Sequence, residues 1–195
     1  MSAPLTLSDI ADLRAYERTR EETRRRVIEM KRWRRVPVGP IVTFVFENAD
    51  TVRFQVQEMA RAERMVSDEQ IQAELDIYNP LVPGPGELSA TLFIELTSKE
   101  DLRHWLPRLV GVERSVRLVV GDGVVAASVP ADHAAQLTRP EVTASVHYVR
   151  FQLTPEQVER FAAGPVSLAV EHPRYRHQTP LGEETRAALL GDLRR

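Results

Sequence analysis

The sequence has no cysteine among its 195 residues. This absence excludes disulfide bonds, thiolate zinc sites, thiol nucleophiles and iron–sulfur clusters that the chain would hold through cysteine. Methionine remains as its sole sulfur-bearing residue. We therefore expect no cofactor, and the lack of cysteine suits a reducing compartment.

Long apolar runs are also missing, because no stretch approaches the roughly 20 apolar residues that span a bilayer. The first ten residues contain neither a basic leader nor an apolar segment. The 26 basic and 28 acidic residues leave a formal charge of only −2, so there is no global field to attract nucleic acid or anionic lipid. These features predict a cytoplasmic protein with no membrane partner.

Signatures of common enzyme classes are absent too. The sequence has no Gly-x-Ser-x-Gly elbow, Walker loop, Gly-x-Gly-x-x-Gly or His-Glu-x-x-His motif. The run 121–123, Gly-Asp-Gly, is typical of a hairpin turn rather than a phosphate loop, since a strand pattern follows it. A recognisable NTPase, Rossmann dehydrogenase, hydrolase or zincin is not indicated.

The apolar spacing predicts an α+β fold, with a mostly antiparallel sheet of about seven strands, flanking helices and a long basic N-terminal helix. The helix is expected over 8–35, capped by Thr6 or Ser8, and capping boxes at Ser67 and Thr154 predict two further helix starts. We divide the chain into an N-terminal helix, 1–35, and an α+β domain, 36–195. Strands are expected over 41–47, 51–57, 88–96, 114–120, 124–129, 142–153 and 166–171, with residues 48–50 as a hairpin turn.

Positive charge is concentrated at the start, where the first 35 residues hold 10 basic and 6 acidic side chains. Phosphates of a nucleic acid are one candidate partner for this patch. The alternative is an acidic surface of the same body or of a second subunit, and we favour protein because the whole chain is rich in arginine, with only 2 lysines. A homodimer through the Trp33 end of the helix is a further expectation. The predicted partner or anion patch consists of Arg24, Arg25, Arg26, Arg32, Arg34 and Arg35.

Polar side chains are dense around the end of the predicted strand 51–57. Gln57, Arg61 and Arg64 share one face of a helix if the chain turns helical there, and amide and guanidinium groups could line a pocket for an anion or a partner's backbone. The alternative is a hydrogen-bonded network that anchors helix to sheet. The candidate binding residues are Gln55, Gln57, Glu58, Arg61, Glu63, Arg64, Tyr78 and Asn79.

The five histidines raise the question of a metal site, since imidazole is a common ligand. Asp101 and His104 share a helix face, but a di-iron bundle needs such a pair twice. Surface or hydrogen-bonded histidines are the structural alternative. The remaining metal candidates are His147, Glu171, His172 and His177.

Several longer runs resemble the bacterial family DUF3501, a domain of unknown function. The likeness extends over nearly the whole chain and carries no established activity, so it transfers no catalytic residue. The runs are 38–43, 46–51, 54–64, 78–95 and 109–114, followed by His147-Tyr148 and His172-Pro173.

The resemblance implies a setting in which such proteins are encoded beside a rubrerythrin and an iron–sulfur oxidoreductase, which suggests oxidative-stress defence or electron transfer. Without cysteine the chain has no evident way to carry electrons itself. We therefore expect a non-catalytic accessory or scaffold protein that binds these redox partners. The alternative is a metal-dependent enzyme that uses Glu58, Glu63, His147, His172 and His177.

Overall fold

The computed structural model of the chain describes residues 4–129 and 141–194. Its strands form two antiparallel sheets of four strands each, so the α+β class is confirmed and the single sheet of about seven strands is wrong. The first sheet has the order β1 (Arg35–Val38), β2 (Val42–Glu47), β3 (Glu87–Ile94), β6 (Val146–Gln152). The second has the order β5 (Gly123–Ala126), β4 (Val116–Val120), β7 (Val166–His172), β8 (Tyr175–Pro180).

The two sheets meet at both edges. Between β8 and β1, the Thr179 hydroxyl donates to the carbonyl of Pro37 at 2.8 Å. On the opposite side, Ser128 follows β5 and exchanges two backbone hydrogen bonds with Arg150 of β6, at 2.8 and 2.9 Å. The eight strands therefore enclose the main core.

That core is built mainly from alternate apolar residues that both sheets turn inward, and helices α6 and α7 add residues such as Phe161 and Leu189. Phe44 and Phe46 of β2 are completely buried, in one cluster with Phe151 of the same sheet and Leu118 of the other sheet. Burial of each such side chain stabilises the fold by about 1.5–3 kcal/mol relative to exposure. The strands are thus held mainly by a conventional apolar interior.

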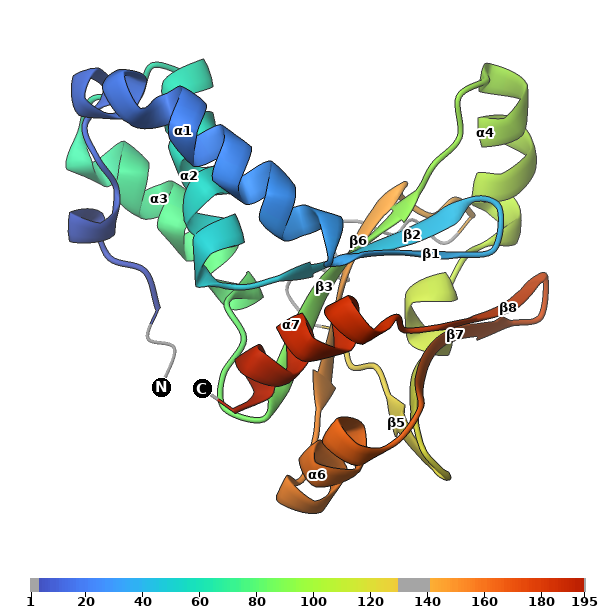
Figure 1. The fold of residues 1–195 in the computed structure, drawn as a ribbon. Coiled ribbons are helices and arrows are strands. Elements are labelled where there is room, and N and C mark those ends of the chain that lie inside the picture. Colours follow the sequence, from blue (N-terminus) through green and yellow to red (C-terminus); the bar gives the residue numbers. More distant parts are fainter. Residues whose placement is uncertain (1–3, 130–140, 195) are drawn as a thin grey trace.

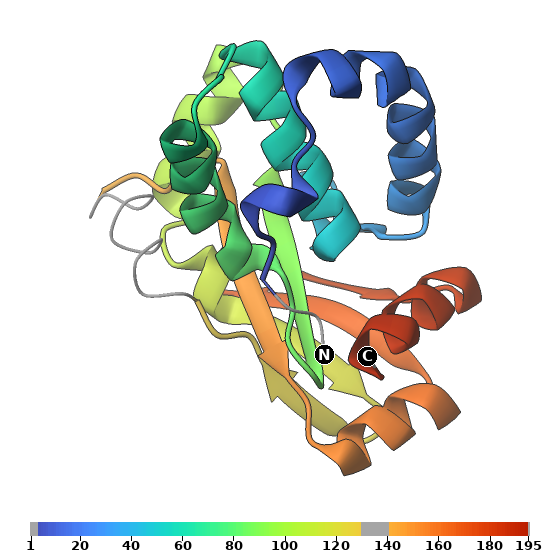
Figure 2. The same cartoon turned by 90° about the vertical axis from the view of Figure 1, so that its left-hand side faces the viewer.

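Figures 1 and 2 show α1, α2 and α3 gathered on one side of the molecule, with the strands, α6 and α7 beside and below them. A second apolar cluster, which includes Val52, Val56 and Leu75, joins α2 to α3, and Ile10 of the N-terminal segment and Tyr148 of β6 pack against it. No helix within the described ranges combines the length and apolar character needed to cross a membrane. The helices are α1 (Leu13–Arg32), α2 (Ala49–Ala62), α3 (Asp68–Tyr78), α4 (Lys99–Trp105), α6 (Pro155–Ala163) and α7 (Glu183–Leu193).

The predicted strand 51–57 and its hairpin turn are wrong, because this stretch is α2. Asn48 caps the helix by accepting from the amide of Thr51 at 3.0 Å, and the Thr51 hydroxyl accepts from the amide of Asn48 at 2.9 Å. Val52, Val56 and Ala60 are spaced by four and are all buried on one helical face. This spacing and the cap outweigh the short alternation that suggested a strand.

The N-terminal helix is shorter than the predicted 8–35. Asp12 caps α1 by accepting from the amide of Ala15 at 2.9 Å, whereas Thr6 caps a separate 3-10 turn, η1 (Leu7–Asp9). At the other end β1 begins at Arg35. The helix starts predicted from the boxes at Ser67 and Thr154 are confirmed.

Candidate functional site

Two of the predicted binding residues use their amides to hold the N-terminal segment. Gln57 accepts from the amide of Ala11 at 2.9 Å and donates to its carbonyl at 2.8 Å. Asn79 repeats the arrangement with Leu5, at 2.7 and 2.9 Å. Each side-chain amide thus binds both backbone groups of one residue, as a neighbouring strand would. The amide oxygen and nitrogen of both side chains are therefore engaged by the backbone of the fold.

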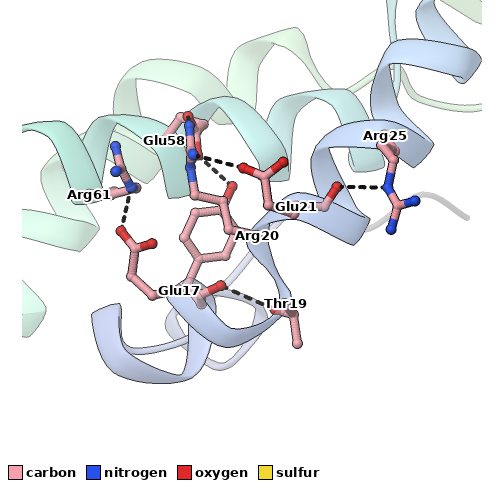
Figure 3. Close-up of polar contacts among 8 residues, drawn as sticks. Glu17, Thr19, Arg20, Glu21, Arg25, Glu58 and Arg61 are labelled. Atoms are coloured by element: carbon pink, nitrogen blue, oxygen red, sulfur yellow. Dashed lines mark hydrogen bonds and ion pairs between the residues drawn. The ribbon is translucent and has the colours of Figure 1, made fainter.

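Glu58 joins α2 to α1 (Figure 3). Its carboxylate accepts from Arg20 Nε at 2.8 Å, from Arg20 Nη2 at 2.9 Å and from the Tyr16 hydroxyl at 2.7 Å. These bonds, chiefly the one from Arg20, hold the pKa of Glu58 below its ordinary value against the opposing effect of burial. Burial, followed by the bond to Glu58, raises the pKa of Tyr16. Arg61 lies one turn further along α2 and pairs with Glu17 of α1.

The other predicted binding residues do not converge on this network. Gln55 is half-buried on α2, whereas Glu63 and Arg64 are exposed beyond its end. Arg64 has a φ of 54°, the left-handed conformation in which chains often leave a helix. Tyr78 packs against the second apolar cluster. The candidate binding residues are therefore divided between contacts inside the fold and open surface.

His147 is buried at the start of β6. Its Nε2 lies 2.9 Å from both the Thr143 hydroxyl and the carbonyl of Ala144, and its Nδ1 lies 3.9 Å from a carboxylate oxygen of the buried Glu113. Burial lowers the pKa of His147, although the nearby Glu113 charge raises it in part. This pair brings together one histidine and one carboxylate.

The remaining metal candidates lie in separate surroundings. His172 approaches the carbonyl of Val110 at 3.2 Å, whereas His177 packs its ring on Tyr175 with centroids 4.4 Å apart. Glu171 pairs with Arg117 at 3.6 Å. Within residues 4–129 and 141–194, no three His, Asp or Glu side chains come together as a metal-binding group. The predicted set His147, Glu171, His172 and His177 is not assembled.

Four residues of the predicted arginine patch are exposed on α1: Arg24, Arg25, Arg26 and Arg32. Arg25 donates to the backbone carbonyl of Glu21 at 3.4 Å (Figure 3), and Arg32 pairs loosely with Glu29 at 3.7 Å. Arg24 and Arg26 have no hydrogen bond or ion pair within the described part of the chain. These guanidinium groups are accessible from solution.

Arg34 and Arg35 depart from that prediction. Arg34 is buried and forms two hydrogen bonds with the buried carboxylate of Asp192, at 2.6 and 3.1 Å. Arg35 lies on β1 and pairs with Glu95. Arg34 is therefore a structural residue, and Arg35 is neutralised by a neighbour in the fold.

The structure adds Arg14 and Arg18 to the exposed arginines of α1. Arg18, Arg25 and Arg32 are seven residues apart, so they occupy nearly the same side of the helix over about 21 Å. Tyr16 and Val27 are the buried residues of α1, and they mark the opposite side. Counting residues at a spacing of seven could have found this row from the sequence.

Comparison with known proteins shows what the chain is similar to. A family model described as "Protein of unknown function (DUF3501)" matches residues 4–193. A crystal structure of a protein of unknown function from Burkholderia pseudomallei K96243 has a TM-score of 0.90 with this chain and 37% sequence identity, covering 98% of this chain and 100% of that one. No curated protein matches.

Proposed function

This chain belongs to the DUF3501 family, and we propose that it is a non-catalytic accessory protein that binds an acidic protein partner through the exposed face of α1. The observation that carries the proposal is the row of Arg18, Arg25 and Arg32, which is exposed along one side of α1. Arg24 and Arg26 are also exposed, and each points about 100° away from this row, on opposite flanks. α1 holds eight Arg or Lys and four Glu side chains. An interface partner of opposite charge would neutralise this excess.

A protein partner fits this face better than a nucleic acid does. Glu21, Glu22 and Glu29 are also exposed on α1, between the arginines. A phosphate backbone would meet repulsion at each of these carboxylates, whereas a protein surface can place a cation opposite each one. The mixed pattern therefore favours a partner with acidic side chains and some basic ones.

Two further observations support a binding role. Gln57 and Asn79 were the best candidates for a polar pocket, but their side-chain amides form hydrogen bonds with the N-terminal backbone. The histidine and carboxylate candidates of a metal-dependent enzyme lie in separate places. Three arginines of α1, by contrast, are accessible in one row.

The partners that the family resemblance implies, a rubrerythrin and an iron–sulfur oxidoreductase, are the first to test. In such a system a chain without cysteine would position or hold the electron carriers rather than carry electrons. Its role in oxidative-stress defence would then follow from the complex that it forms.

The test is co-purification from the host with the tagged full-length chain at native expression. Recovery of the rubrerythrin or the oxidoreductase is expected with the wild type and with the control R103E/R176E, which reverses two exposed arginines outside α1. Recovery should be lost with R18E/R25E. Equal recovery with R18E/R25E, recovery of nucleic acid in place of protein, or stoichiometric metal in the purified chain would overturn the proposal.

A further inference from the structure

A groove of about 300 Å³ lies beyond the N-terminal end of the arginine row, where η1, the start of α1, the end of α2 and the start of α3 meet. It is partly open to solvent and presents both apolar and polar surface. Most of its lining residues are apolar, among them Leu7, Ile10 and Met65, and Asp12, Arg14 and Asp68 supply the charged ones.

Val66 stands at the same groove, in the turn between α2 and α3. It is 84% exposed, whereas the other large apolar side chains exposed within the described residues range from 40 to 57%. A projecting apolar side chain beside an apolar hollow is what a two-fold interface requires, since both copies contribute the same patch. A small ligand in the groove would leave Val66 unexplained.

The charges around the groove have the same self-complementary character. Arg14 of α1 and Asp68 of α3 both line it, and both are exposed. Neither has an ion-pair partner within the described part of the chain. A two-fold axis between two copies would bring the arginine of each toward the aspartate of the other, which gives two ion pairs from one contact.

We propose that this groove is the interface of a symmetric homodimer, in which Val66 of each copy enters the groove of the other and Arg14 pairs with Asp68 across the axis. The occupant is thus a second copy of this chain. The inference goes beyond the proposed function and is independent of it, because Arg18 and Arg25 do not line the groove. It also replaces the Trp33 end of the helix as the expected dimer contact.

The test is sedimentation of the full-length chain over a range of concentrations. The wild type should show a reversible monomer–dimer equilibrium. V66E should weaken dimerisation by about tenfold or more, because a carboxylate would lose its hydration where the valine made an apolar contact. The matched control V124E changes a side chain that is 57% exposed on β5, and it should leave the equilibrium unchanged.

Swapping the charges of Arg14 and Asp68 provides a second test that does not depend on Val66. R14D and D68R should each weaken the dimer, whereas the double variant R14D/D68R restores opposite charges across the axis and should recover dimerisation. Thermal unfolding of each variant verifies that it folds. A wild type that stays monomeric at the highest concentration, an equal effect of V66E and V124E, or no recovery in the double variant would overturn the proposal.

Discussion

Arg34 and Asp192 form a buried ion pair between residues 158 positions apart, with two hydrogen bonds of 2.6 and 3.1 Å. Arg34 lies between α1 and β1, and Asp192 lies in the last turn of α7. The pair therefore ties the C-terminal helix to the first sheet at the point where the N-terminal helix joins it.

Replacement of Asp192 by Ala should destabilise the fold by about 3–5 kcal/mol, because it leaves the Arg34 guanidinium buried without a counter-charge. Urea unfolding measures the change. The control is Asp122→Ala, which removes a pair with Arg160 at 3.1 Å whose aspartate is 90% exposed, and should cost less than about 1 kcal/mol. A similar loss of unfolding free energy in the two variants would contradict the stabilising role of the buried pair.

The Glu58 network predicts a dependence of stability on pH. Because Arg20, followed by Tyr16, lowers the pKa of Glu58, its contribution is complete above the unfolded-state value of about 4.3 and is lost as pH falls through the lower folded-state pKa. The difference in unfolding free energy between wild type and Glu58→Gln should therefore stay constant above about pH 5 and shrink as pH falls below the unfolded-state value of about 4.3. Urea unfolding at each pH measures it.

The control for this prediction is Glu22→Gln. Glu22 is an exposed carboxylate on the same helix as Arg20, and it has no ion pair within the described residues. The unfolding free energy of Glu22→Gln should differ from that of wild type by a small and nearly constant amount over the same range of pH. A Glu58→Gln difference that is equally constant would show that Glu58 does not contribute through its charge.

Gly39 is predicted to tolerate no side chain. Its φ is +75°, and a Cβ there would lie 2.5 Å from the Tyr175 hydroxyl oxygen, which itself donates to the carbonyl of Val38 at 2.7 Å. Gly39→Ala should therefore cost more than the roughly 1–2 kcal/mol of a left-handed alanine. Gly121→Ala is the matched control, since its φ is +59° with no atom within 4 Å of the added Cβ. Equal shifts in thermal unfolding would contradict the close contact with Tyr175.

Gln57→Leu should release part of the N-terminal segment while α2 stays folded. The amide of Ala11 loses its acceptor in this variant and should exchange its hydrogen faster. The amide of Leu5 should stay protected, because Asn79 holds it independently. Hydrogen exchange measured by NMR resolves the two amides. Unchanged exchange at Ala11 would show that Gln57 does not hold this part of the N-terminal segment.

The parts of the fold that could be predicted depend on neighbouring residues. The boxes at Ser67 and Thr154 place two helix starts correctly, since the cap and its partner are three residues apart. The prediction of a strand over 51–57 was wrong because Val52, Phe54 and Val56 alternate as in a strand. The buried residues Val52, Val56 and Ala60 are instead spaced by four, which is typical of a helix.

The parts that could not be predicted depend on distant residues. β8 has one fully buried side chain, Tyr175, and exists because it pairs with β7 and lies against β1. Gln57 and Asn79 find their partners 46 and 74 residues away in the N-terminal segment. Arg34 looked like its exposed neighbours until the fold placed Asp192 beside it. Residue type alone cannot separate such structural groups from binding groups.

The binding of α1 to an acidic partner is tested most directly by the equilibrium affinity of the purified chain for the co-purified protein at several salt concentrations. Affinity should fall as salt rises. R18E/R25E should bind about tenfold more weakly or worse, with a shallower salt dependence, while R103E/R176E should bind like wild type. Equal affinity and equal salt dependence in all three proteins would contradict a charged α1 interface.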